Sequence, residues 1–468
     1  MEKSVKKNFV YNLLYQILTF LLPLITTPYL SRILGAEKTG VYSYAYSIAY
    51  YFVLFCMLGL NNYGNREIAK VRDDKYRLSK TFWSIYGLQL CTGVIVTVIY
   101  VIYIGAFRNQ LISWIMLLYV VSALFDVNWF FWGLEEFKIT VARNTIIKLL
   151  SVGCILLFVK SVEDIYIYAI IMTGSMLLSA AVLWPYLKGR VIWIKPRLSE
   201  ILKHLKPNLI LFIPVIAVSV YKIMDKIMLG NMSGYSEVGL YDYAEKVIAI
   251  PICCVNALGA VMLPRMSHLV ATNNTEMEKD TVYKSLIIGT ALSVAMSFGL
   301  IGIADVFVPV FYGEGYTKCI ALFYVLLPSC VFLAIANVIR TQCLIPRSMD
   351  KGYTISLIFG AAINLLTNLL LIPVLQSVGA AIGTLIAEGV VCLTQVLLVR
   401  KHLPIKDYWK DILYLVAVGF VMSFAVYFIP IIFSGIFTLL IKICVGMIIF
   451  STLMLIRYKA LMTQLLHR

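Results

Sequence analysis

The chain has 468 residues, of which 61% are hydrophobic and only 14% are charged. A soluble globular protein needs more polar residues to cover a core of this size, so the composition excludes that class. The net charge of +16 does not indicate nucleic-acid binding, because the Lys and Arg residues are spread in short clusters between apolar runs. We therefore expect an all-α integral membrane protein.

Apolar runs of about 20 residues, the length that crosses a hydrocarbon core of about 30 Å as a helix, occupy almost the whole chain. They predict about fourteen membrane spans, at residues 8–31, 40–62, 81–105, 111–133, 143–160, 165–187, 208–230, 239–263, 284–311, 317–341, 353–374, 378–399, 409–431 and 434–456. If the N-terminus is cytoplasmic, only four basic residues lie on outer loops: Lys38, Arg108, Lys160 and Lys318. This bias predicts that both termini are cytoplasmic.

One predicted hairpin, at residues 28–70, has the sequence PYLSRILGAEKTGVYSYAYSIAYYFVLFCMLGLNNYGNREIAK. We expect its first helix to leave the membrane at residues 32–35, a polar break to follow at residues 36–39, and an apolar helix to re-enter. The hairpin recurs 199 positions later, with identities between Gly40 and Gly239, Tyr42 and Tyr241, Tyr44 and Tyr243, Ala45 and Ala244, and Arg66 and Arg265. The Leu34-Gly35 pair matches Leu229-Gly230 if the second turn is four residues longer. Such duplication is typical of transporters.

The repeat predicts an N-terminal lobe of six spans at residues 1–190 and a C-terminal lobe of six spans at residues 208–403. Two additional spans and a cytoplasmic tail follow at residues 404–468. Because six is an even number, both lobes enter the membrane in the same orientation, which predicts a repeat axis along the membrane normal and a central cleft.

An amphipathic cytoplasmic linker helix is expected between the lobes, at residues 191–207. Its apolar face would consist of Leu198, Ile201, Leu202 and Leu205. This pattern suits a helix that lies on the inner leaflet, and a soluble linker helix is the alternative.

A charge in a spanning helix costs about 2.5–3.5 kcal/mol on insertion scales, so such residues usually face a watery cavity or a partner. The predicted spans and their ends contain Arg32, Lys148, Lys222, Lys226, Lys246, Lys442, Asp126, Asp225, Asp242, Glu245, Asp305 and Glu388. Arg32 and Lys226 occupy nearly equivalent places in the repeat, so we expect both to face the cleft. Mutual pairing or snorkelling to the outer surface is the alternative, and for Lys246 it is the favoured interpretation.

Lys148 and Lys222 are further candidates for binding an anionic headgroup. For Lys442, a cavity-facing role and a pair between helices are both open. Three acids are candidates for coupling to a cation: Asp126, Asp225 and Glu388.

Tyr42, Tyr46 and Tyr50 recur every four residues and form either stacking planes for sugar rings or a packing stripe. The four His residues lie at basic ends of spans and are expected at the surface, at His204, His268, His402 and His467. The ten Cys residues include no Cys-x-x-Cys pair, so no metal site or cofactor is indicated.

The run PYLSRILGAEKTGVYSYAYSIAYYF, followed by LGLNNYGNREIA, resembles the start of Wzx-type polysaccharide repeat-unit flippases, in the multidrug/oligosaccharidyl-lipid/polysaccharide exporter superfamily. The resemblance implies a two-lobed, MATE-like fold and alternating access. It also implies translocation of an undecaprenyl-diphosphate-linked oligosaccharide across the bacterial cytoplasmic membrane, for capsule, O-antigen or a related exopolysaccharide. The implied partners are that lipid-linked substrate, membrane lipid, and the polymerase and export machinery of the glycan pathway.

Two other functions remain open. A cation-coupled exporter of small drugs would have the same fold and would need acids in its cleft, for which Asp126, Asp225 and Glu388 are available. A membrane glycan polymerase or glycosyltransferase would need a sizeable outer loop or an Asp-x-Asp metal site, and the sequence has neither. It also lacks a phosphate-cradling Gly-rich loop, which argues against nucleotide hydrolysis as the energy source.

Overall fold

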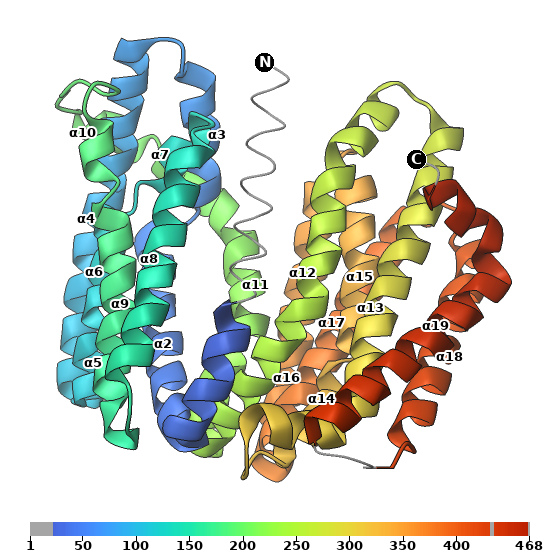
Figure 1. The fold of residues 1–468 in the computed structure, drawn as a ribbon. Coiled ribbons are helices and arrows are strands. Elements are labelled where there is room, and N and C mark those ends of the chain that lie inside the picture. Colours follow the sequence, from blue (N-terminus) through green and yellow to red (C-terminus); the bar gives the residue numbers. More distant parts are fainter. Residues whose placement is uncertain (1–21, 431–434, 467–468) are drawn as a thin grey trace. The chain divides into compact units, whose positions relative to one another are not determined.

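The computed structural model describes residues 22–430 and 435–466, which are helical apart from short turns and loops and contain no β-strand (Figure 1). Thirteen helical segments in this part of the chain are long and apolar enough to cross a membrane. They coincide with the second to fourteenth predicted spans, so the expected all-α membrane fold is confirmed. The first predicted span, 8–31, lies largely outside the described residues, although residues 22–33 are helical.

The chain divides into two compact units, Met1–Gly230 and Asn231–Arg468. Unit 1 contains α2 (Gly35–Met57), α3 (Leu60–Val71), α4 (Lys75–Phe107), α5 (Leu111–Ile115), α6 (Leu117–Phe125), α7 (Asn128–Gly133), α8 (Phe137–Phe158), α9 (Ile165–Ala181), α10 (Leu198–Leu202) and nearly all of α11 (Leu205–Met232). Two short 3₁₀ turns flank α9: η1 (Val162–Asp164) and η2 (Trp184–Leu187). Helix α2 packs against α4 and α6, and α9 packs against α6 and α8.

Unit 2 contains α12 (Tyr235–Ala271), α13 (Thr275–Tyr312), α14 (Lys318–Leu326), α15 (Ser329–Ile339), η3 (Arg340–Leu344), α16 (Asp350–Leu375), α17 (Ser377–Val399), α18 (Ile405–Tyr427) and α19 (Gly435–Leu466). Helix α13, yellow in Figure 1, packs against α12, α14, α15, α18 and α19. It is therefore the helix around which unit 2 is assembled.

The turn that opens the predicted hairpin is sharper than expected. Gly35 has φ +71, in the left-handed region that favours glycine, and α2 begins at this residue. The predicted polar break at residues 36–39 was wrong, because these residues form the first turn of α2. Gly234 has φ +93 and precedes α12. Gly234 lies 199 positions after Gly35, so it is the equivalent residue; the match to Gly230 through a four-residue insertion was wrong.

The two units begin in the same way. The segments Gly35–Val71 and Tyr235–Ala271 each have 37 residues. A polar N-cap follows in both cases: the Asp74 carboxylate accepts from Tyr76 N at 3.0 Å, and the Asn274 side chain accepts from Met277 N at 3.3 Å. Such caps satisfy amide groups that the first turn leaves open, which fixes where α4 and α13 begin.

The linker between α9 and α11 is less helical than expected, because only Leu198–Leu202 forms a helix before α11 begins at Leu205. It is attached to α4 of unit 1. Trp83 Nε1 donates to Ile192 O at 2.9 Å, and Ile192 N donates to Ser79 Oγ at 3.0 Å. Trp193, next to Ile192, is 72% exposed.

The last two helices are joined to α13 by charged groups near both of its ends. Lys442 of α19 donates to both carboxylate oxygens of Asp305, at 3.2 and 3.1 Å. Toward the other end, Asp411 of α18 accepts from Tyr283 of α13 at 2.8 Å and pairs with Arg457 of α19 at 2.8 Å. The sequence left two roles open for Lys442, and the structure shows a pair between helices.

Candidate functional site

The predicted site residues divide unequally between the two units. Unit 1 contains Arg32, Asp126, Lys148, Lys222, Asp225 and Lys226, whereas Glu388 belongs to unit 2. Arg32 and Lys226, which the repeat assigns to different lobes, therefore belong to one compact unit.

Arg32 lies in the last turn of the helix at residues 22–33, and its side chain is exposed. The Nη1 atom donates to Pro28 O, one turn earlier in the same helix, at 2.8 Å. This contact satisfies a carbonyl at the helix C-terminus, where a cation is electrostatically favoured. A guanidinium carries five N–H donors in a fixed fork, a geometry that suits an anion.

Helix α11 carries the densest group of predicted residues. Lys222 and Lys226 are one helical turn apart, with Lys222 exposed and Lys226 half-buried. Asp225 is 1% exposed. Near these residues, Tyr51 of α2 donates to Ser219 O of α11 at 3.0 Å. The contact fixes α2 against the part of α11 that carries the charges.

Asp126 has a structural role in the turn between α6 and α7. Its carboxylate accepts from Asn128 N at 2.9 Å and from Asn128 Nδ2 at 2.6 Å. The Asn128 Oδ1 atom in turn accepts from Arg143 Nη2 at 2.9 Å. Lys148, the remaining predicted residue of unit 1, is half-buried in α8, about one and a half turns after Arg143.

The tyrosine stripe of α2 packs against neighbouring helices of unit 1. The Tyr46 ring stacks on Tyr119 of α6 with centroids 5.1 Å apart, and the Tyr42 ring contacts Tyr168 of α9 at 4.7 Å. Tyr42 and Tyr168 are buried, at 8% and 5% exposure. The alternative of a packing stripe therefore holds for Tyr42, while Tyr50 remains half-exposed.

In unit 2, Glu388 is buried in α17, at 4% exposure. The Lys246 ammonium pairs with Asp242, four residues earlier in α12, at 2.8 Å, which confirms the pairing favoured for Lys246. A buried carboxyl in a spanning helix is costly unless it has partners or binds a cation.

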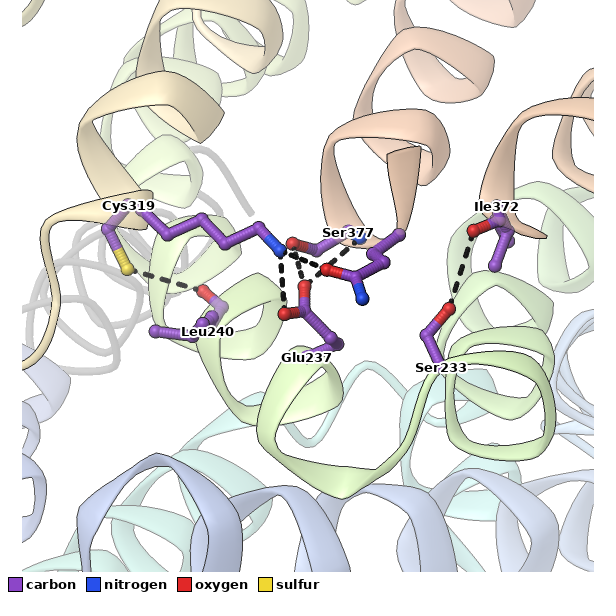
Figure 2. A network of polar contacts seen from close by, with 8 residues as sticks. Ser233, Glu237, Leu240, Cys319, Ile372 and Ser377 are labelled. Atoms are coloured by element: carbon purple, nitrogen blue, oxygen red, sulfur yellow. Dashed lines mark hydrogen bonds and ion pairs between the residues drawn. The ribbon is translucent and has the colours of Figure 1, made fainter. Parts of the chain in front are cut away.

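Glu237 lies at the centre of a polar network that joins the ends of several helices in unit 2 (Figure 2). Its carboxylate accepts from Lys318 of α14 at 2.6 Å and from the Ser377 hydroxyl of α17 at 2.5 Å. Lys318 also donates to Gln376 Oε1 at 2.6 Å. Nearby, Cys319 Sγ donates to Leu240 O at 3.6 Å. These contacts hold α12, α14 and α17 together at one end of the unit.

Tyr316, in the loop before α14, packs against Tyr243 with ring centroids 5.4 Å apart. Burial raises the pKa of the Tyr316 hydroxyl to about 12, so this group is neutral at physiological pH.

Three residues have environments that the sequence did not predict. His204 was expected at the surface, but it is 5% exposed and shares a 2.6 Å hydrogen bond with the Tyr63 hydroxyl. Arg143 is 6% exposed and donates to Ser179 O at 2.6 Å. Arg340, in η3, was omitted from the charges of the predicted span 317–341 although it lies inside it. Counting every charge up to the ends of each span would have found both arginines.

Comparisons with known proteins agree with this architecture. A family model described as polysaccharide biosynthesis protein matches residues 5–270, more than half of the 468-residue chain. A proposed O-antigen transporter of Escherichia coli strain K12 is 24% identical over 366 residues, covering 76% of this chain and 87% of the relative. A protein of the same description from Shigella dysenteriae is 23% identical over 362 residues, covering 76% and 90%.

Among solved structures, the lipid II flippase MurJ in an inward closed conformation superposes with a TM-score of 0.78 at 16% identity, covering 96% of this chain and 99% of MurJ. An outward-facing MATE multidrug transporter of the MOP superfamily gives a TM-score of 0.55 at 14% identity, covering 86% of this chain and 97% of the transporter. The resemblance of the first seventy residues to polysaccharide flippases is confirmed. The chain belongs to the polysaccharide biosynthesis protein family and has the fold of MurJ and the MATE transporters.

Proposed function

We propose that the protein is a flippase that moves an undecaprenyl-diphosphate-linked oligosaccharide across the membrane by alternating access. The observation that carries this proposal is the match to two proposed O-antigen transporters, each over 76% of the chain. The family match over residues 5–270 and the MurJ-like fold support it.

The chemistry of such a substrate suits a helical membrane protein with cations in its spans. A diphosphate and a glycan cannot cross hydrocarbon without a polar path, whereas a polyprenyl tail can stay in lipid. The proposed headgroup-binding residues are Arg32, Lys148, Lys222 and Lys226. Support comes from the exposure of Arg32 and Lys222 and from the one-turn spacing of Lys222 and Lys226.

Asp225 and Glu388 are the proposed residues for cation coupling, because both are buried acids in spanning helices. Asp126 is a weaker candidate for binding a coupling cation, since its carboxylate already accepts two hydrogen bonds from Asn128. The membrane in question is the bacterial cytoplasmic membrane with both termini inside, and the glycan polymerase and export machinery are the proposed partners.

The test is a flipping assay with the full chain in proteoliposomes. A fluorescently labelled undecaprenyl-diphosphate oligosaccharide should become accessible to a membrane-impermeant quencher with time, and protein-free liposomes should show no such change. In cells, depletion of the protein should leave completed repeat units on the inner leaflet and remove polymer from the surface. Equal quenching with and without protein would contradict the proposal.

A cation-coupled drug exporter is the second candidate, favoured by the buried Asp225 and by the match to MATE transporters. Under this alternative, depletion would raise drug sensitivity while polymer output stayed unchanged. A single depletion strain therefore distinguishes the two functions if drug sensitivity and surface polymer are both measured in it.

A further inference from the structure

The span Lys318–Leu344 of unit 2 ends in a π-helical turn, η3, in which the hydrogen-bond ladder of α15 widens. Such turns are rare and frequently occur at functional sites, because they redirect a side chain relative to its helix. Arg340 is the first residue of η3. Residues 341–344 of the turn are buried, whereas Arg340 is half-buried.

The Arg340 side chain has no ion pair or hydrogen bond with any residue that the structure describes, and its Nε atom is buried without an acceptor. A guanidinium stays charged in proteins, so it cannot reduce this cost by losing a proton. Arg340 lies four residues before the end of the span, and snorkelling would expose the whole guanidinium to water. The buried Nε shows that the side chain is only partly hydrated.

The one acid that the structure pairs with this segment, among the described residues, is already engaged. Glu278 of α13 pairs with Arg347, and the Arg347 Nη1 atom is still buried without an acceptor. The stretch 340–347 also contains Gln342, which is 0% exposed and whose Nε2 and Oε1 atoms both lack a hydrogen-bond partner among the described residues. Three buried N–H donors in eight residues therefore lack acceptors. The two arginines of the segment outnumber the one carboxylate that pairs with it, so the segment is positively charged.

The contact between α12 and α15 makes no hydrogen bond with the Arg340 side chain among the described residues. Asn337, one turn before Arg340, donates to Asn256 Oδ1 of α12 at 2.8 Å. Asn337 Oδ1 is itself buried without a donor, so this amide does not bind the Arg340 guanidinium, and a neutral amide could not cancel its charge.

We propose that Arg340 and the π-helical turn bind a phosphate group at the end of this span. A phosphate offers several acceptor oxygens and negative charge, and its geometry matches the fork of a guanidinium. The inference rests on the proposed function in one respect: charge bias predicts this end of the span to be cytoplasmic, the side on which a lipid diphosphate would load. The same chemistry could come from a phospholipid headgroup or from a free phosphate.

The experiment measures ligand binding by the purified full-length protein in detergent with three probes: undecaprenyl diphosphate, inorganic pyrophosphate and phosphatidylglycerol. Arg340→Gln should weaken binding of undecaprenyl diphosphate and pyrophosphate by at least about tenfold, as expected for loss of a charge-assisted contact. The affinity of Arg340→Lys should lie between those of Arg340→Gln and the wild type. Lysine keeps the positive charge but loses the two parallel N–H donors of the guanidinium. The matched control is Lys284→Gln, which removes a unit 2 cation paired with Asp280 at 2.7 Å.

A second measurement does not require a variant to fold. Pyrophosphate should protect Arg340 of the wild-type protein from phenylglyoxal, an arginine-specific reagent, with peptide mass spectrometry as the readout. Loss of phosphatidylglycerol binding alone in Arg340→Gln would support the phosphate site and assign it to a bilayer lipid.

The site would be overturned by two results together. Arg340→Gln and the wild type would bind each of the three probes equally well, and pyrophosphate would not protect Arg340 from phenylglyoxal. Failure of the proposed function has a different signature. In that case the wild type would not translocate the lipid-linked oligosaccharide, while the dependence of pyrophosphate binding on Arg340 would persist.

Discussion

The Nζ atom of Lys318 lies 2.6 Å from Oε1 of Glu237, so that an ion pair joins the first turns of α14 and α12 (Figure 2). The Glu237 side chain is 13% exposed and the Lys318 side chain 32% exposed. Because Ser377 donates to the same carboxylate from its hydroxyl and its backbone amide, Glu237 holds three helices of unit 2 at once.

Glu237→Gln should therefore lower the free energy of unfolding by about 1–3 kcal/mol, the range for a lost hydrogen bond to a charged group. The measurement is thermal unfolding of the purified protein in detergent. Lys284→Gln is the matched control, because its pair with Asp280 is exposed and such pairs contribute about 0–1 kcal/mol. A melting temperature for Glu237→Gln equal to that of the control would contradict the central role of Glu237.

Lys442→Met should destabilise the protein more strongly. The Lys442 side chain is 0% exposed, and its removal leaves Asp305 in a spanning helix without its cation. Breaking a fully buried pair costs about 3–5 kcal/mol, and we expect the lower part of this range because the Asp305 side chain is 34% exposed. Replacing both residues, as in Lys442→Met with Asp305→Leu, should restore much of the thermal stability. If the double variant melts no higher than Lys442→Met, the loss comes from packing and not from the unpaired acid.

Gly35→Ala and Gly234→Ala should each lower the free energy of unfolding by about 1–2 kcal/mol. A Cβ atom disfavours the positive φ angle that the backbone has at these two turns. Gly153→Ala provides the control: Gly153 has no positive φ, and nothing lies within 4 Å of an added Cβ there. An alanine at that position in α8 should be neutral or slightly stabilising. Equal melting temperatures for all three variants would argue against a conformational requirement at the turns.

Arg32→Gln and Lys226→Gln should each impair polymer export several-fold or more at normal protein abundance. Two cations can hold a diphosphate jointly, and each charge-assisted contact contributes about 1.5–3 kcal/mol. Arg32→Lys and Lys226→Arg should retain more activity, because they keep the charge. Surface polymer is measured against protein abundance, and export by the Gln variants at the wild-type level would exclude both residues from the headgroup site.

Membrane orientation is tested by single cysteines in a cysteine-free background. Probes at the exposed positions Lys75 and Lys203 should react with a membrane-impermeant maleimide only in inside-out vesicles. Probes at Asn109 and Glu314, which are also exposed, should react in intact cells. Labelling of Lys203 in intact cells would reverse the orientation.

The positions of the spans could be predicted from the sequence because a bilayer imposes a length and an apolar composition on each helix. The exact turns could not, because a helix break depends on the backbone. Ala36–Thr39 is polar enough to suggest a loop, yet a single left-handed residue, Gly35, is enough to reverse the chain. The repeat was found from Tyr and Gly identities. The residue equivalent to Gly35 is Gly234, which keeps the spacing of 199 positions and also has a positive φ angle.

Side-chain environments were predicted less well, because polarity does not reveal the partners that a fold supplies. His204 has the position of a surface residue in the sequence, but the Tyr63 hydroxyl from a distant helix allows it to be buried. Asp126 looked like a free acid in a span and proved to accept from Asn128 in its own turn. Arg340 was overlooked because it lies near the end of a span, where basic residues are usual.

The pair between Asp305 and Lys442 also constrains how this chain can change over evolutionary time. Asp305 belongs to α13, around which unit 2 is assembled, while its cation arrives on the last helix, α19. A descendant that lost α18 and α19 by a single truncation would expose a lone carboxylate to lipid. Two further helices can therefore be gained in steps. Once α13 carries this acid, however, the loss of α18 and α19 requires a compensating substitution at Asp305. The pair thus makes the last two helices harder to lose than to gain.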